Sequence, residues 1–463
     1  EGMHYYHYGM SNGAPAMAAM AKRGDDLFAL PHYQTNRLWY AHSIEPFGYT
    51  FSTHHDTVDD KGGLAPNYIL KKWTTPEDPI FDYVWRNRIG DGSNTISYRG
   101  DFLTYALFSS DWDGADESPQ PELDPQSKGL PNSYYCPKRG LLITRSAWDL
   151  DALALHFECR PEVYGPSHSH SDRNGFTLSA LGRKWVIDRG FHVSESKDHA
   201  SVLIDGVGQG HFGPKGEVVD YADSDGLTMI AGDASYAYQY RYTFGTRLNN
   251  LENQGFNWEL ELLPEVIAHY SDTQDPNDEP WLTNGTYTYK AEYNPVQYAF
   301  RTAALARGSN PYVLIADNIR KDNASHTYQW LLPVEDDLVV ESATSDSLTL
   351  VAESATSQSP RLLIKVLSAS GLQALNLETY TVETSSEIMT YENFGTGKRV
   401  VISSTTVEPD FRIVLLPLAA GDTVPAFANP STDVYTVQWS SQTDTWTFTP
   451  TGTGRDTIGF SRQ

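Results

Sequence analysis

The feature that most constrains the fold is a long series of short alternating runs that begins near residue 133. Within each run apolar or β-branched residues alternate with polar ones, and Gly, Asn, Asp or Pro separates one run from the next. This pattern is typical of antiparallel strands in a β-sandwich. We therefore expect a central antiparallel sandwich over residues 133–355 and a C-terminal β-sheet domain over 356–463. The runs include GLLITRS, LALHFE, FTLSAL, KWVIDRG, LTMIAG, PYVLIADNI, TYQWLLP, LTLVAE, RLLIKVL, FRIVLLPL and TWTFTP.

Residues 1–112 show a different pattern, which favours helices. APAMAAMAKRG has Ala and Met at helical spacing and a glycine stop, and three further segments contain proline near their start and end in bulky or basic residues. A Pro- and acid-rich stretch over 113–132 predicts a linker. Helices followed by strands indicate the α+β class or separate domains. The three further segments are PHYQTNRLWYAHSI, APNYILKKW and PEDPIFDYVWRNRIG.

The charge of the chain argues against several classes of partner. Its 463 residues carry a formal net charge of −25, whereas nucleic-acid binding needs a basic face that contacts phosphates. A local basic cleft for an anionic glycan remains compatible with this charge. No run of about 18 apolar residues occurs, so no membrane-spanning helix is expected. The chain opens on EGMHYYHYGM, which resembles the interior of an element, and we expect a processed or cut part of a longer polypeptide.

The two cysteines, Cys136 and Cys159, flank the sequence GLLITRSAWDLDALALHF. Two strands around a turn near residues 147–150 would place them opposite each other, where a cross-strand disulfide is geometrically reasonable. A disulfide would fit the periplasm or the exterior of the cell. Two free buried thiols are the alternative.

The stretch YGPSHSHSDRNGF contains His168, His170 and Asp172, and the later segments VIDRGF and KDHASVLIDG contain Asp188 and His199. FTLSALGRKWVID predicts a hairpin around a glycine, which would bring His170 to face Asp188, and the next strand could add His199. Two imidazoles and one carboxylate suit Zn²⁺ well. The alternative is a set of hydrogen-bonded polar residues on a sheet face. A barrel-type metallohydrolase is disfavoured because the strands lack helical spacers.

Other candidate site residues are less constrained by spacing. In EGMHYYHYG, Tyr5 and Tyr8 would share one face of a helix. A tyrosine acts as an acid or base only where its neighbours stabilise the phenolate, and otherwise it serves packing. His54 and His55 in STHHDT could line a cleft or lie in solvent. Arg173 could contact a carboxylate or sulfate, or could pair with a neighbouring aspartate.

Several of these segments, taken in order, resemble the heparinase II/III-type polysaccharide lyases, which include alginate, heparin and related uronate lyases. The resemblance extends to about residue 335, and its most specific part is the segment from HSHSD to IDRG. It implies part of an incomplete (α/α) toroid at residues 1–112, followed by stacked antiparallel sheets. The segments that carry it are EGxxYxxYG, RGLLITRSAWDLDALALHFE, GPSHSHSDRNGFTLSALGRKWVIDRGF, HASVLIDGVGQG and FRTAALARGSNPYVLIADNI.

The resemblance also implies roles for individual residues. It assigns a bound Zn²⁺ to His170, Asp188 and His199, where the ion organises the site, and it makes Asp172 a supporting or structural residue. Tyr8, with Tyr5 as the second choice, would be the acid and often also the base of β-elimination, with His168 facing the substrate. Arg173, His54 and His55 are the candidates for substrate binding. Members of the family also carry an Asn or His on an earlier toroid helix, so the resemblance implies an N-terminal toroid segment that is missing here.

The expected activity is therefore cleavage of a uronic-acid-containing polysaccharide, by a protein that is secreted or periplasmic. A base removes the C5 proton, the C4–oxygen bond breaks, and an unsaturated uronate remains. A uronate C5-epimerase would use the same proton abstraction without elimination. A glycan-binding β-sandwich protein without activity is the third possibility. Alginate, ulvan, glucuronan, heparan and chondroitin all offer a suitable C5 proton.

Overall fold

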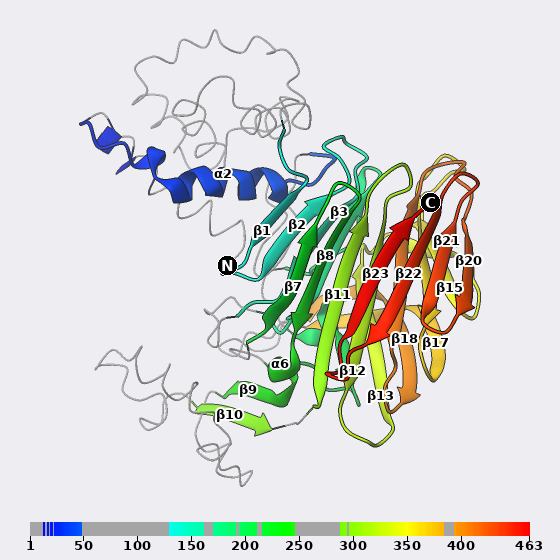
Figure 1. Cartoon of the computed structure of the whole chain (residues 1–463). Helices are drawn as coiled ribbons and strands as arrows, with labels where there is room; N and C mark the ends of the chain where they lie inside the picture. Colours follow the sequence, from blue (N-terminus) through cyan, green and yellow to red (C-terminus); the bar gives the residue numbers. More distant parts are fainter. Residues whose placement is uncertain are drawn as a thin grey trace.

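A computed structural model gives the architecture as stacked antiparallel sheets with one long helix at their edge (Figure 1). The elements that carry the argument lie within the ranges that the structure describes. These are residues 13, 16–17, 19–21, 23–48, 129–161, 170–190, 193, 195–210, 215–245, 288–293, 296–383 and 393–463. No helix in these ranges is long and apolar enough to cross a membrane.

The first layer is a nine-stranded sheet in the order β1-β2-β3-β4-β5-β13-β18-β17, with β6 also paired to β13. Consecutive strands of its first half are neighbours, so this half is a simple meander of hairpins. Its strands are β1 (Ser133–Cys136), β2 (Leu141–Arg145), β3 (Ala154–Glu158), β4 (Gly175–Ala180), β5 (Arg183–Val186), β6 (Val202–Ile204), β13 (His326–Val334), β17 (Leu372–Glu383) and β18 (Asn393–Thr406).

The second layer is an eight-stranded sheet in the order β14-β15-β16-β19-β12-β11-β8-β7. Its strands are β7 (Glu217–Asp223), β8 (Leu227–Asp233), β11 (Tyr298–Ala306), β12 (Tyr312–Arg320), β14 (Leu338–Ala343), β15 (Ser347–Ala352), β16 (Arg361–Ser368) and β19 (Phe411–Leu418).

The third layer is a four-stranded sheet, and a small hairpin completes the β structure. The four strands, in sheet order, are β20 (Ala426–Ser431), β21 (Val434–Gln438), β22 (Thr443–Pro450) and β23 (Asp456–Arg462). The hairpin pairs β9 (Tyr240–Gly245) with β10 (Thr288–Tyr293). The helical elements with assigned bounds are η1 (Leu27–Ala29), α2 (Pro31–Ser43), η2 (Ser196–Asp198) and α6 (Ser235–Gln239).

The middle sheet is buried on both faces, which explains the unbroken apolar runs of its central strands. In β12, Val313 and Ile315 belong to the core shared with the nine-stranded sheet. Tyr312 and Leu314 point the other way, into the core shared with the four-stranded sheet. Successive side chains of a strand face opposite sides, so one strand supplies both cores. Each fully buried aliphatic side chain contributes about 1.5–3 kcal/mol.

Helix α2 is fastened to the first sheet by Arg145. The guanidinium of this residue, at the end of β2, donates hydrogen bonds of 2.9 and 3.0 Å to the carbonyl oxygens of His42 and Ile44. These oxygens lie at the C-terminal end of the helix, where backbone acceptors have no partner within the helix. The guanidinium also lies 4.2 Å from the centre of the Trp148 ring. The buried guanidinium of Arg145 therefore joins the C-terminal end of α2 to the first sheet, beside which the helix lies in Figure 1.

The predicted strands are confirmed, and so is the predicted helix PHYQTNRLWYAHSI, which forms α2. The described residues between 13 and 21 are also helical, and Gly24 follows with a φ of 102°. The remaining predicted helices and most of the expected linker lie outside the described residues. The division into domains stays a prediction; its boundary at 355–356 falls between β15 and β16, which are hydrogen-bonded neighbours.

Of the two alternatives for the cysteines, the structure has the free thiols: Cys136 and Cys159 are not bonded. Leu141 lies opposite Glu158, so the β2–β3 hairpin is centred about two residues later than a Cys136–Cys159 pairing would require. Cys136 also belongs to a separate strand, β1, which reverses at a turn and pairs with β2. Strand β2 thus lies between the two cysteines. Cys159 is a buried thiol and Cys136 is half-buried.

Candidate metal centre

Two candidate ligands meet because the β4–β5 hairpin is tight. Leu181 and Gly182 form its two-residue turn with φ values of 53° and 80°, and two positive φ values in sequence are the signature of the favoured type I′ hairpin turn. The segment before β4 and the segment after β5 are thereby brought together. The Nδ1 atom of His170 lies 3.8 Å from Oδ1 of Asp188.

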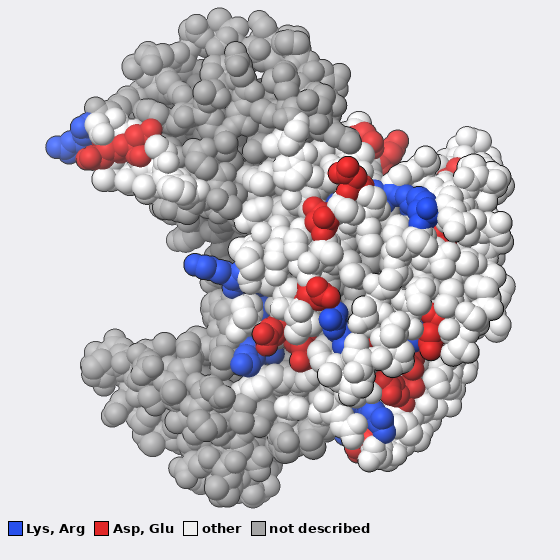
Figure 2. Space-filling model, in the orientation of Figure 1, with Lys and Arg blue, Asp and Glu red and all other residues white. Residues whose placement is uncertain are grey.

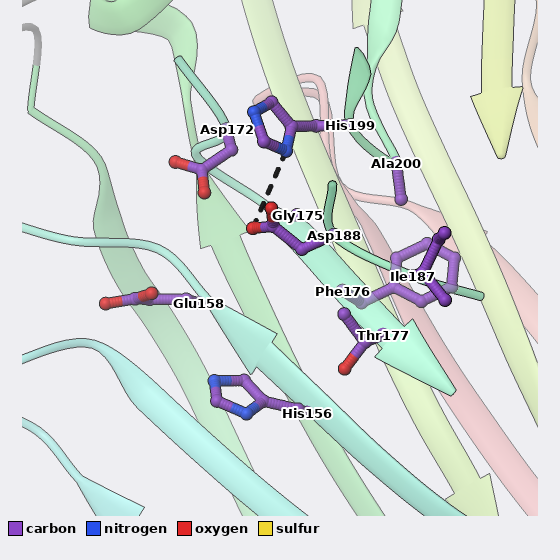
Figure 3. A pocket seen from close by; sticks show the side chains of 10 residues that line it. All are labelled: His156, Glu158, Asp172, Gly175, Phe176, Thr177, Ile187, Asp188, His199 and Ala200. Atoms are coloured by element: carbon purple, nitrogen blue, oxygen red, sulfur yellow. Dashed lines mark ion pairs between the residues drawn. The ribbon is translucent and has the colours of Figure 1, made fainter. Parts of the chain in front are cut away.

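The third candidate ligand arrives from another part of the same sheet. His199 lies between η2 and β6, and both β5 and β6 pair with β13. This shared neighbour places the end of β5 beside the start of β6. The Nδ1 atom of His199 lies 3.6 Å from Oδ2 of Asp188, the contact drawn in Figure 3. The ring centroids of His170 and His199 are 5.0 Å apart.

Two buried arginines hold the loop that carries His170. Arg160 donates a 2.7 Å hydrogen bond to the carbonyl oxygen of His170 and forms an ion pair with Asp172. Arg173 donates a 2.9 Å hydrogen bond to the same carbonyl oxygen, and its Nη1 lies 3.8 Å from Asp172. The loop then reverses at Asn174, which has a φ of 65°. The position of the His170 backbone is therefore set by hydrogen bonds from two guanidinium groups to one carbonyl oxygen.

Asp188 is ionised in this environment. Burial alone raises the pKa of its carboxyl group, but the imidazoles of His199 and His170 outweigh burial and hold the pKa well below its usual range. The backbone N–H of Gly190 also donates a 2.7 Å hydrogen bond to Oδ1. A buried carboxylate with two imidazoles beside it is an arrangement that accepts a cation.

His170, Asp172, Asp188 and His199 form a buried cluster that could hold a metal ion, since one donor atom from each lies within 4.8 Å of all the others. The His–Asp separations of 3.6 and 3.8 Å are longer than hydrogen bonds. They approach the roughly 3.3 Å between two ligands of a tetrahedral ion that is bound at about 2.0–2.1 Å. In addition, Nε2 of His199 is buried with no hydrogen-bond partner among the described residues. The donor set fits a divalent ion.

A pocket opens beside the cluster, with about 320 Å³ of space between atoms, part of it continuous with solvent. His156 and Glu158 line it from β3, together with Asp188 and His199 (Figure 3). They alternate with Leu155 and Phe157, which belong to the core, so they point to the opposite face of the sheet. Neither residue was among the predicted site residues. The polar positions of LALHFE were the signal that could have identified them.

The cluster is also braced from the second sheet by Arg301 of β11. Its Nη1 atom donates hydrogen bonds of 2.8 and 2.6 Å to the carbonyl oxygens of Asn174 and Ala200. Asn174 lies in the loop that follows His170, and Ala200 directly follows His199. One side chain therefore holds both loops that carry the histidines. This residue was also absent from the predicted site.

The structure thus brings together His170, Asp188 and His199, as the hairpin argument predicted, and adds Asp172 to them. Arg173 is 3% exposed and pairs with Asp172, which is the second of the two interpretations that its sequence position allowed. Its predicted contact with substrate stays a prediction. The remaining predicted site residues lie outside the described residues: Tyr5, Tyr8, His54, His55 and His168.

Comparison with known proteins identifies the fold. No protein-family model and no curated protein sequence matches the chain. Solved structures do match. A heparinase III with methylated lysines aligns with a TM-score of 0.57 at 12% identity, and covers 99% of this chain and 57% of its own. Heparan sulfate lyase HepC from Pedobacter heparinus gives 0.54 at 14% identity, with the same shares covered. Another heparinase III gives 0.53 at 10% identity, with 99% and 59% covered.

This chain has the heparinase III-type polysaccharide lyase fold. It spans a little under three fifths of the length of these structures. The resemblance inferred from the sequence is confirmed at the level of the fold. The stacked antiparallel sheets are the expected β-sandwich, whereas the toroid remains a prediction.

Proposed function

We propose that this chain is part of a secreted or periplasmic polysaccharide lyase that cleaves a uronic-acid-containing polysaccharide by β-elimination. The observation that carries the proposal is the buried cluster of His170, Asp188 and His199, which lies at the ends of strands of the first sheet in a chain with a polysaccharide lyase fold. Its position beside a pocket lined by further polar residues also supports the proposal.

In the proposed reaction Tyr8 is the proton donor to the leaving oxygen and the base that removes the C5 proton, with Tyr5 as the second choice. His168 faces the substrate and assists in proton transfer or in charge neutralisation. The C5 proton is very weakly acidic because its removal places a second negative charge on a carboxylate that is already ionised, so a group that neutralises this charge is required. The C4–oxygen bond then breaks, and no water is consumed.

His170, Asp188 and His199 would hold a divalent ion, which we propose is Zn²⁺. Bound there, the ion would supply positive charge and fix the loops around it. Other residues of the chain position the ligands. Arg160 and Arg173 donate hydrogen bonds to the backbone carbonyl oxygen of His170, and Arg301 donates to the loops that follow His170 and His199. Asp172 neutralises Arg160 in the interior.

The test is incubation of the full-length protein of which this chain is proposed to be part with alginate, ulvan, glucuronan, heparan sulfate and chondroitin in D₂O, followed by proton NMR of the products. A lyase gives the olefinic C4 proton of an unsaturated uronate. A C5-epimerase gives deuterium at C5 and an inverted uronate without an olefinic signal. The absence of both changes with every polymer would overturn the proposal and leave a glycan-binding protein as the alternative.

A further inference from the structure

The four-stranded sheet distributes its charges in an unusual way. Strands β20 to β23 contain three charged residues, Asp444, Asp456 and Arg462, and all three lie on the face toward the second sheet. Arg462 pairs with Asp444 at 2.7 Å, and Asp456 lies 3.1 Å from Arg412 of β19. Asp444 is completely buried. In an ordinary surface sheet charged side chains occupy the solvent face.

The solvent face of the same sheet carries hydroxyl groups instead. On β22, Thr443, Thr445, Thr447 and Thr449 alternate with the buried residues Asp444, Trp446 and Phe448. Cross-strand pairing extends these threonines into rows: Thr436 lies opposite Thr445, which lies opposite Ser461, and Thr449 lies opposite Thr457. We call this surface the hydroxyl face; it consists of Thr436, Thr445, Thr447, Thr449, Thr457 and Ser461.

The hydroxyl face is free to contact a ligand. None of its six hydroxyl groups hydrogen-bonds to another residue of the described part of the chain. In Figure 2 the surface over β20 to β23 is largely white, with charged side chains toward its margins. Threonine is a good strand former, but strand propensity alone does not explain why every charge of these strands points inward in a chain that is 20% charged.

The size of the hydroxyl face helps to identify its occupant. Its residues lie on three strands, β21 to β23, and three strands about 4.8 Å apart and about six residues long cover roughly 300 Å². A stable protein–protein interface needs about 800 Å² on each partner, so a second copy of this chain is a poor fit. A polysaccharide chain needs only a strip of this width, and its hydroxyl and C–H groups match the hydroxyl and methyl groups of threonine.

Charge points to the same class of ligand. A chain of net charge −25 repels a uronate polymer as a whole. The hydroxyl face carries no charge of its own strands and offers hydrogen-bond donors to carboxylate oxygens. We propose that the hydroxyl face is an auxiliary docking surface for an anionic uronate polysaccharide, a role that rests on the proposed function for the identity of the polymer. It would hold long chains near the site and leave short oligosaccharides unaffected.

The test is affinity electrophoresis of the intact chain in gels that contain alginate, with hydroxyethyl cellulose as a neutral polymer in a parallel gel. The double variant Thr445→Glu/Thr447→Glu should weaken alginate binding by about tenfold, since like charges about 4 Å apart repel one another even in water. The matched control is Ser354→Glu/Ser357→Glu, which adds the same charge on the exposed β15–β16 turn. Thr445→Ala/Thr447→Ala removes two hydroxyls without adding charge and should weaken binding less.

Three results would overturn the docking surface. The first is equal migration of the wild-type chain in gels with and without alginate. The second is a loss of affinity in the control as large as in the Thr445→Glu/Thr447→Glu variant. The third is a dimer in sedimentation that only this variant dissociates. Electrophoresis measures binding without turnover. A chain that shows no lyase activity but is still retarded by alginate would therefore contradict the proposed lyase function and support the docking surface. Where turnover occurs, kcat/KM should fall for the polymer and stay constant for a tetrasaccharide.

Discussion

Arg301 and Asp317 form a bidentate ion pair in the interior, with Nε–Oδ1 and Nη2–Oδ2 distances of 2.7 and 3.0 Å. The indole N–H of Trp330 donates a further 2.8 Å hydrogen bond to Asp317. Both partners of the pair belong to the second sheet, whereas the remaining donor atom of Arg301 reaches the loops of the metal centre. The inter-sheet core and the candidate site therefore depend on one guanidinium.

This relationship predicts a large effect of Arg301→Met. The substitution leaves the Asp317 carboxylate buried without its cation, which costs about 3–5 kcal/mol, and it releases the carbonyl oxygens of Asn174 and Ala200. We expect the free energy of unfolding in urea to fall by this amount. The double variant Arg301→Met/Asp317→Asn also removes the unpaired negative charge of Asp317 and should recover part of the lost free energy of unfolding. Equal stability of Arg301→Met and wild type would contradict the assigned role.

The metal centre predicts about one equivalent of zinc per chain after dialysis against metal-free buffer. His199→Ala and His170→Ala each remove a ligand and should abolish stoichiometric binding. Asp172→Asn should retain the ion with about 10–100-fold weaker affinity, as is usual for residues that support ligands. Mass-spectrometric metal analysis provides the measurement, and His326→Gln, which lies in another cluster, is the matched control. Zinc content unchanged in His199→Ala would exclude this cluster as the site.

The pH dependence of stability should carry a contribution from His326. Its two ring nitrogens lie 2.7 Å from Asp205 and 2.9 Å from Asp322. Burial alone lowers the pKa of His326, but the hydrogen bonds to Asp322 and Asp205 outweigh burial and raise it. The pKa of Asp205 is lowered: burial opposes this shift, and the Thr327 N–H, His326 and Lys321 outweigh burial. The pKa of Asp322 is lowered mainly by the Ala324 N–H and His326.

The sign of this contribution follows from the three shifts. A raised histidine pKa adds stability below about pH 6.5 and loses it as the pH rises through the folded-state value; a lowered aspartate pKa adds stability above about pH 3.9 and loses it as the pH falls. The difference in Tm between wild type and His326→Gln should thus be largest between about pH 4 and 6.5. The side chains are partly exposed, so we expect at most about two degrees. A difference that grows toward pH 9 would contradict the assignment.

The cysteines should differ in reactivity. Burial raises the pKa of the Cys159 thiol to about 12, and only a thiolate reacts rapidly with iodoacetamide. Labelling of the native chain at pH 8, followed by peptide mass spectrometry, should modify half-buried Cys136 well before Cys159. In guanidinium chloride both should react equally. Recovery of a Cys136–Cys159 linked peptide from the non-reduced protein would show that the register of β1 and β2 is wrong.

Much of the site could be predicted from the sequence because it depends on local geometry. The FTLSALGRKWVID pattern encodes a two-residue hairpin, and the ends of a hairpin must meet, so His170 and Asp188 followed from spacing. Cys136 and Cys159 show the limit of the same reasoning. The β2–β3 hairpin is centred two residues later than a pairing of the two cysteines requires, and Cys136 lies on the additional strand β1. The two cysteines are therefore separated by β2.

The supporting residues could not be predicted in this way, since their contacts are made between sheets. Arg301 lies 127 positions from Asn174 along the chain, and alternation within β11 does not indicate what its inward face meets across the core. The helical part was expected from proline and capping patterns, of which α2 is confirmed. The order of strands in the two large sheets, where β5 neighbours β13 and β12 neighbours β19, also depends on long-range pairing that local patterns do not contain.

The most direct test of the central claim is ultraviolet absorbance during incubation of the full-length protein of which this chain is proposed to be part with the panel of uronate polysaccharides, with wild type and Tyr8→Phe compared side by side. Phenylalanine keeps the ring and removes the hydroxyl that would transfer the proton. The account predicts a rising unsaturated-uronate signal with at least one polymer for the wild type, reduced at least about a hundredfold in the variant. A rise of equal rate in both would remove Tyr8 from the mechanism, and a flat trace for the wild type with every polymer would contradict the lyase itself.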